Sequence, residues 1–188
     1  MASAYSQLSE HLATGRKIRI ETNRPADPLL NGYLMQLSDR LGLLHCFDDF
    51  EPDGYSIFRL ADVTSVRSGK FERHWDRMLR GEGLLGGLDR ELLVDLSDIQ
   101  TAIGSVSRQF KLMTVQCEDG EEDVEDFFIG QAVSFEGTEL IFDAFDALGQ
   151  WNDAPSRILL DEITMVQFVT PYIRHFSKYL TGSPTGGI

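Results

Sequence analysis

The sequence predicts a mainly β protein with short helices, built from two tandem, strongly bent, five-stranded antiparallel barrels. Two observations indicate this fold class. Short stretches of alternating apolar residues recur at regular spacing with turn signals between them, which is typical of small all-β domains. The same series of segments also occurs twice along the 188-residue chain. Such internal repetition indicates two copies of one structural unit.

The repetition is seen in four pairs of segments that keep the same order in both halves of the chain. The pairs are 32–39 with 130–137, 43–50 with 141–148, 59–66 with 159–166, and 71–79 with 172–180. The offset grows from 98 to 101 along the chain, as expected when loops take up short insertions.

Each repeat is predicted to open with a helix, because apolar residues recur there at spacings of three and four. In the first repeat these residues are Tyr5, Leu8 and Leu12. In the second repeat they are Leu93, Leu96, Ile99 and Ile103.

Strands follow each predicted helix. A first strand is expected at 17–21 (KIRIE) and at 112–117 (LMTVQC), where apolar residues alternate. The next strand begins at Gly32 or Gly130, and a glycine within a strand marks a sharp bend. An apolar strand and a final pair complete each repeat. The turn signals RPADP, PDG and EDG separate strands, and a short helix ends each repeat.

The glycines at the centre of the chain indicate a linker between the repeats. The predicted segments are repeat one at 1–80, a Gly-rich linker at 81–91, repeat two at 92–180, and a disordered tail at 181–188. The linker contains the pattern G-x-G-x-x-G. A dinucleotide site needs that pattern between a buried strand and a helix. The preceding residues are charged and helix-like, so we favour a linker.

The order of one helix and five short bent strands resembles the Sm-like fold, an SH3-like small β-barrel. Residues 32–48 (GYLMQLSDRLGLLHCFD) resemble the first Sm motif, with a strand glycine, the turn acid Asp39 and an apolar strand. Residues 58–68 (FRLADVTSVRS) resemble the second motif, and residues 96–168 resemble the pattern through Gly130, LIF and EITMV. The resemblance implies a tandem pair of barrels and, for the family, RNA binding.

The sequence departs from the RNA-binding members of that family at the turn. In those members an amide side chain closely follows the turn acid, whereas here Arg40 and Leu41 follow Asp39. The corresponding turn of repeat two, FEGTE, also lacks Asn and Gln. The resemblance therefore favours the fold more than it favours RNA binding.

The charge of the chain is distributed unevenly. The net charge is −13, of which residues 1–90 contribute −1 and residues 91–188 contribute −12. An acidic surface repels phosphate, so the second half is not expected to bind nucleic acid. Basic clusters in the first half are either solvated faces or a nucleic-acid site. The nucleic-acid candidates are Arg16, Lys17, Arg19, Arg67 and Lys70.

The Arg-His pairs of the two closing helices are candidate sites for a ligand or a protein partner. The pairs are Arg73 with His74 and Arg174 with His175, and each is flanked by aromatic residues. At helical spacing the aromatic residues form a packing stripe, and the Arg and His lie at its polar edge. The alternative is that both pairs bind an anionic group, which suits the guanidinium.

No motif points to catalysis, a metal or a cofactor. The chain lacks a Gly-x-Ser-x-Gly elbow, a His-Glu-x-x-His pair, a CxxC and a P-loop. His45, Cys46 and Asp48 do not converge, because alternate strand residues face opposite sides. The acidic run at 118–126 lacks the order of a calcium loop, so we expect a solvated loop, with weak divalent binding or a basic partner as the alternative.

These observations predict a non-enzymatic binding or scaffold protein that acts through protein contacts and self-association. With two cysteines and no secretory signal or membrane span, it is expected to be cytoplasmic. One alternative is an RNA-binding regulator that uses the basic clusters of repeat one. The other is a small-molecule sensor with a site between the repeats near the Arg-His pairs.

Overall fold

The computed structural model describes residues 4–24, 29–87, 92–118 and 125–184. Four of the predicted segments fall partly outside the described residues. These are the turn at 24–28, the end of the linker at 81–91, the centre of the acidic run at 118–126, and the end of the tail at 181–188.

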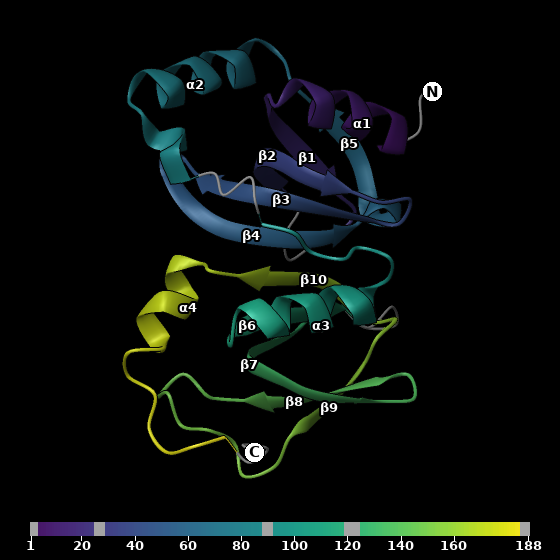
Figure 1. Ribbon diagram of the computed structural model, residues 1–188, viewed down its shortest axis with the longest axis vertical. Helices are drawn as coiled ribbons and strands as arrows, with labels where there is room; N and C mark the ends of the chain where they lie inside the picture. The colour runs from purple at the N-terminus through teal and green to yellow at the C-terminus, as the bar shows by residue number, and fades with distance from the viewer. Residues whose placement is uncertain (1–3, 25–28, 88–91, 119–124, 185–188) are drawn as a thin grey trace. The chain divides into compact units, whose positions relative to one another are not determined.

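The chain divides into two compact units, residues 1–97 and residues 98–188. In Figure 1 the first unit runs from purple to teal and the second from teal to yellow. Each unit contains a helix, then five strands, then a second helix. The mainly β fold with short helices is therefore confirmed.

Unit 1 forms a bent antiparallel sheet with the strand order β5-β1-β2-β3-β4. Helix α1 packs against β2 and β5, while α2 packs against β1. The elements are α1 (Ala4–Thr14), β1 (Lys17–Thr22), β2 (Leu29–Leu37), β3 (Leu41–Asp48), β4 (Glu51–Arg59), the 3₁₀ turn η1 (Leu60–Asp62), β5 (Val63–Arg67), α2 (Lys70–Gly81) and the 3₁₀ turn η2 (Leu84–Gly87).

Apolar alternation fixes which face of the unit 1 sheet forms the core. Ile18 and Ile20 point to one face of β1 and are fully buried, as is Leu8 on α1. The central strand β3 is buried from Leu41 to Phe47, because both of its faces are covered. The opposite face of β1 therefore carries Lys17 and Arg19, and both line one cavity of unit 1.

Unit 2 repeats this arrangement with the strand order β10-β6-β7-β8-β9. Its helix α3 packs against β7 and β10. The elements are α3 (Ile99–Gln109), β6 (Met113–Glu118), β7 (Glu125–Glu136), β8 (Glu139–Ala144), β9 (Ser156–Leu159), β10 (Ile163–Phe168) and α4 (Pro171–Phe176). Among the described residues no pairing joins the two ends of either order, so each five-stranded sheet is open.

The start of the second helix differs from the sequence prediction. Helix α3 begins at Ile99, because the carboxylate of Asp98 accepts a hydrogen bond from the Thr101 backbone N–H at 2.7 Å and caps the helix. Leu93 therefore precedes the helix, and its side chain is 71% exposed. In the first helix only Leu8 of the predicted apolar stripe is buried.

Part of the predicted linker packs onto unit 1. Leu84 and Leu85 of η2 contact a buried cluster of Tyr33, Phe47 and Leu79. Further along, the side-chain amide of Gln36 donates to the Leu92 carbonyl, and its oxygen accepts from the Val94 N–H. These contacts place residues 92–97 in the first compact unit, with the boundary at Ser97.

Candidate functional site

On the face of β1 opposite Ile18 and Ile20, two side chains are cationic. Residues directly opposite each other on antiparallel strands point to the same face. Arg19 of β1 pairs with Asn31 of β2 on one side and with Arg67 of β5 on the other. Lys17 precedes Arg19 by two residues and pairs with Tyr33. Three cations thus share one face of two neighbouring strands.

A cavity of about 430 Å³ lies between this face, the N-terminal part of α2 and the β3–β4 turn. We refer to it as the α2 cavity. It combines three cations, an amide, three aromatic rings and three carboxylates. Its lining residues are Lys17, Arg19, Asn31, Phe47, Asp48, Asp49, Arg67, Phe71, Glu72 and Trp75.

Lys17 is an unusually buried lysine. Its residue is 5% exposed, and its ammonium lies 5.5 Å from the centroid of the Trp75 ring, at cation–π distance. Within the described residues the ammonium makes no hydrogen bond or ion pair. Burial lowers the pKa of Lys17, because removal from water penalises the charged form. Nearby carboxylates, Glu72 foremost, act in the opposite direction.

Arg19 and Arg67 differ in their hydrogen bonding, although they are directly paired in the register of β1 with β5. The Nε of Arg19 is buried and has no hydrogen-bond partner in the described part of the chain. The guanidinium of Arg67 instead contacts Glu72, with Nη2 2.7 Å and Nε 2.9 Å from Oε1. Among the three cations of the α2 cavity, Arg19 is therefore the one whose buried Nε–H has no hydrogen-bond partner in the described residues.

Glu72 is buried at the first turn of α2 and is held by backbone and side chain together. Its Oε2 accepts a hydrogen bond from the Gly69 N–H at 2.7 Å, the half of a capping box that a glycine N-cap can form. Burial acts to raise the pKa of Glu72. Hydrogen bonds from the backbone and from Arg67 outweigh that effect and lower the pKa. Both oxygens of the Glu72 carboxylate are therefore engaged by groups of the protein itself.

Aromatic rings form another wall of the α2 cavity. Trp75 stacks on Phe50 of the β3–β4 turn, with centroids 4.8 Å apart and planes at 4°. Phe71 lies one helical turn before Trp75 and is 61% exposed. The stack fixes one face of the indole, while Phe71 presents its ring to solvent at the edge of the cavity.

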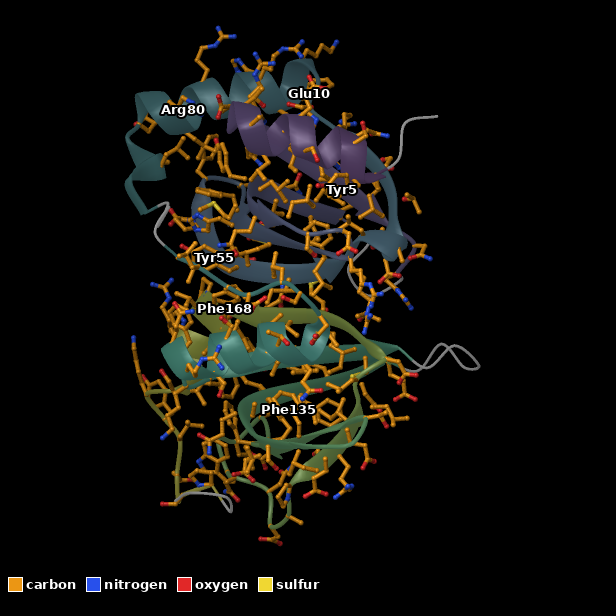
Figure 2. All side chains as sticks on the ribbon, turned by 45° about the vertical axis from the view of Figure 1, so that its right-hand side comes forward. Tyr5, Glu10, Tyr55, Arg80, Phe135 and Phe168 are labelled. Atoms are coloured by element: carbon orange, nitrogen blue, oxygen red, sulfur yellow. The ribbon has the colours of Figure 1, made fainter. Side chains whose placement is uncertain are left out.

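A second groove, of about 300 Å³, runs along α2 and shares Lys17 and Glu72 with the α2 cavity. Its lining residues are Arg16, Lys17, Ser68, Glu72, Arg73, Asp76, Arg77 and Arg80. Figure 2 shows Arg80 on α2. Asp76 accepts hydrogen bonds from the Tyr33 hydroxyl at 2.8 Å and from the Arg80 Nε at 2.9 Å. Burial and the Asp76 hydrogen bond raise the pKa of Tyr33. Both carboxylates of this basic groove are therefore paired internally.

The structure thus brings most of the predicted nucleic-acid candidates together. Lys17, Arg19 and Arg67 line the α2 cavity, and Arg16 joins Lys17 at the basic groove. Lys70 lines neither of them, and its ammonium lies 5.0 Å from the centroid of the Phe71 ring.

The Arg-His pairs lie on the exposed sides of α2 and α4. Arg73 donates from Nη1 to the Ser68 carbonyl at 3.1 Å, and His74 is exposed. Arg174 and His175 are exposed, and the His175 Nδ1 lies 2.7 Å from the Pro171 carbonyl oxygen.

The residues that anchor these helices agree with the predicted stripe only in part. Leu79 is fully buried, and Phe176 and Leu180 pack against a buried cluster that includes Phe145. Phe71 and Tyr172 are 61% and 48% exposed. Glu72 and Leu79 are the buried residues of α2, and Ile173 is the buried residue of α4. Each helix is rotated about its axis so that the residue directly after its first aromatic residue points toward the protein. That residue is Glu72 in α2 and Ile173 in α4.

Unit 2 exposes an apolar surface around α4. Tyr172 contacts both Phe127 and Phe176, with ring centroids 6.1 Å and 4.7 Å apart. Phe176 lines a cavity of about 260 Å³ with Leu148 and Tyr179, which are 75% and 73% exposed. We call these five residues the α4 aromatic surface.

The cluster HCFDD places its side chains on opposite sides of β3. The His45 ring stacks on Tyr55 at 4.6 Å and lies 5.1 Å from Phe47, while the Cys46 thiol is 3.2 Å from the Ser56 hydroxyl. Burial lowers the pKa of His45 to about 4, so its ring is neutral at pH 7. Among the described residues, no three His, Cys, Asp or Glu side chains gather in a way that could hold a metal ion.

None of the helices in the described ranges is both long and apolar enough to cross a membrane. Comparison of the chain with protein-family models, curated proteins and solved structures found no match.

Proposed function

We propose that this chain is a non-enzymatic binding protein that acts through protein contacts and self-association, in the cytoplasm. We further propose that its two units are copies of one Sm-like, SH3-like unit. The shared series of helix, five strands and helix supports this, as does the equal strand order within the two units.

Matching local details support the duplication. The registers pair Gly32 with Cys46 and Gly130 with Ala144, positions that share the offset of 98. Thr64 donates to the Glu21 carbonyl at 3.0 Å, and Thr164 donates to the Gln116 carbonyl at 3.2 Å. Two equivalent hydrogen bonds between the last strand and the first are expected of two copies of one unit, and they support the proposed duplication.

The α4 aromatic surface is the observation on which the binding role depends. Aromatic residues are enriched where proteins meet, because large rigid rings bury much apolar area at a small entropic cost. Leu148, Tyr172 and Tyr179 are each about half exposed or more. Sheet edges offer a second means of association, since β5 pairs only with β1 and β9 only with β8 in the described residues.

Light scattering on the purified chain tests this proposal. The mass should exceed the 21.2 kDa of one chain and rise with concentration. The double variant Leu148→Ser/Tyr179→Ser should return to the mass of one chain. Tyr5→Ser/Leu93→Ser removes an exposed Tyr and an exposed Leu from unit 1 and should leave the mass unchanged. A wild-type mass of one chain at every concentration would contradict the proposal.

The basic groove favours a second candidate function, the binding of single-stranded nucleic acid by unit 1. Five cations line it, and both of its carboxylates are paired within the fold. Cations that outnumber the carboxylates around them are suited to binding phosphates. The affinity of such binding falls steeply as the salt concentration rises.

Fluorescence anisotropy with a labelled single-stranded RNA tests the second candidate. Binding should be strongest at low salt, and Arg16→Gln/Arg77→Gln should lower the affinity and flatten the salt dependence. Arg40→Gln/Arg108→Gln removes the same charge elsewhere and should have the smaller effect. The candidate function is rejected when no binding is detected at low salt.

A further inference from the structure

We propose that the α2 cavity is a binding site for a small organic anion that carries an aromatic ring. The proposal concerns unit 1 and goes beyond the protein-binding role assigned to the α4 aromatic surface. It depends on the cationic donors of Lys17 and Arg19, on the partners that already engage Glu72, and on the aromatic wall of the cavity.

The donors for the anionic group are Lys17 and Arg19. They lie two residues apart on β1, so both side chains point to the face that α2 covers. Lys17 is 5% exposed, and the Arg19 Nε is buried without a partner among the described residues. An oxyanion between them would accept a hydrogen bond from the Arg19 Nε–H and one from the Lys17 ammonium. Charge-assisted hydrogen bonds of this kind are the strong ones.

In the described residues, none of the carboxylates that line the cavity forms an ion pair with Lys17 or Arg19. Glu72 is engaged by Arg67 and by the Gly69 N–H. Asp48 and Asp49 are exposed on the β3–β4 turn, and in the described chain neither forms an ion pair with Lys17 or Arg19. Both aspartates line the same cavity, and the charge of Asp49 acts to raise the pKa of Lys17 without forming an ion pair with it. This arrangement suits a ligand with one compact anionic end and repels an extended polyanion.

The ring of the ligand would lie against α2. Phe71 and Trp75 are four residues apart, so they occupy the same side of the helix, and both line the cavity. The stack on Phe50 holds the indole in one orientation, while Phe71 is 61% exposed. Ligand pockets typically measure about 300–1,000 Å³, and a volume of about 430 Å³ admits one substituted ring.

Titrations of the full chain with phenyl phosphate, inorganic phosphate and phenol separate the two halves of the proposed ligand. Phenyl phosphate should bind at least about tenfold more tightly than either of the other two probes, because only it offers both the anion and the ring. Equal affinities for phenyl phosphate and inorganic phosphate would refute the role of the aromatic wall. The absence of binding by phenyl phosphate at millimolar concentration would overturn the proposal.

The two tryptophans provide a readout that does not depend on changing Lys17 or Arg19. The indole N–H signal of Trp75 in a ¹H–¹⁵N spectrum should shift on addition of phenyl phosphate, and that of Trp151 in unit 2 should not. Trp151→Phe assigns the two signals. Movement of the Trp151 signal alone would place the ligand elsewhere and contradict the proposal.

A variant of Arg19 tests whether this residue donates a hydrogen bond to the ligand. Arg19→Met should lower the affinity for phenyl phosphate at least about tenfold, as expected for the loss of a charge-assisted hydrogen bond. Arg40→Met removes an exposed arginine of the same unit and should leave the affinity unchanged. Equal affinities of Arg19→Met and the wild type would overturn the assignment. Light scattering of the same samples reports the proposed self-association separately, so the two proposals can fail independently.

Discussion

His45 shows how one buried side chain can make the fold sensitive to pH. The residue is 3% exposed, stacks on Tyr55, and has a pKa lowered to about 4 by burial. In the unfolded chain its pKa is about 6.5. Between these two values the unfolded state binds the proton and the folded state does not, so stability falls as the pH drops from about 6.5 to 4.

The variant His45→Phe should remove this part of the pH dependence. It keeps a ring against Tyr55 and Phe47 but cannot be protonated. Chemical unfolding at pH 7 and pH 4.5 should show a smaller loss of unfolding free energy in His45→Phe than in the wild type, by about 1–3 kcal/mol. His74→Gln changes an exposed histidine and should behave as the wild type does. Equal losses in all three proteins would show that His45 is not the titrating group.

Glu72 shows the opposite case, a buried carboxylate whose partners stabilise its charge. The variant Glu72→Gln keeps a similar shape and an acceptor for the Gly69 N–H but removes the charge that pairs with Arg67. We expect a loss of about 1 kcal/mol in unfolding free energy at pH 7, measured by chemical denaturation, since the Arg67 side chain is 49% exposed and partly screened. Glu82→Gln at the end of α2 should cost less. An unchanged stability of Glu72→Gln would contradict this account.

At the scale of elements, a glycine allows β2 to approach β3, and another allows β7 to approach β8. A Cβ placed on Gly32 would lie 1.9 Å from the His45 carbonyl oxygen, and a Cβ on Gly130 would lie 1.9 Å from that of Asp143. These contacts are with backbone atoms, so a side chain cannot be accommodated by a rotamer change. The glycines that the sequence places inside strands are therefore required by strand packing.

Alanine at either glycine should destabilise the protein. Gly32→Ala and Gly130→Ala should each lower the unfolding free energy by about 2 kcal/mol or more, because the backbone of two strands must separate. Gly81→Ala has open space around the new methyl group and should change stability by no more than about 1 kcal/mol. Thermal unfolding of the three variants measures the difference. Similar midpoints for Gly32→Ala and Gly81→Ala would contradict the close approach.

At the scale of the whole molecule, each of the two units has fully buried apolar residues of its own, and the two halves of the sequence differ in how much negative charge they carry. Ile18, Ile20 and Leu43 are fully buried in unit 1, as are Val115, Leu140 and Phe168 in unit 2. The negative charge belongs almost entirely to the second half of the sequence. The cationic sites proposed for unit 1 and the apolar site proposed for unit 2 are therefore chemically distinct, although the folds of the units match element by element.

Each unit should fold by itself. Fragments 1–97 and 98–188 each exceed the roughly 60 residues above which a single core can sustain a domain, so each should unfold cooperatively in a circular dichroism melt. A fragment of residues 1–62 lacks β5 and α2 and should show no cooperative transition. Loss of cooperativity in both longer fragments, with the full chain still cooperative, would show that neither unit is an independent domain.

The sequence by itself determined the series of elements, because these depend on local patterns. Alternation placed Ile18 and Ile20 on one face of β1, and the glycines marked the strands that bend. The basic cluster around Arg16 to Arg19 was also readable, since its members are neighbours in the chain. The mainly β class with short helices follows from such short-range signals, and the structure confirms it.

Only the tertiary structure decided which of these residues meet. Arg19 and Arg67 are 48 positions apart, and their pairing depends on the register of β1 with β5. The burial of Glu72 and the exposure of Phe71 depend on the rotation of α2 about its axis. The spacing of the aromatic residues in the sequence did not predict this rotation. Strand register and helix rotation are set by packing between distant segments, and for this reason the α2 cavity and the α4 aromatic surface could not be predicted from local sequence.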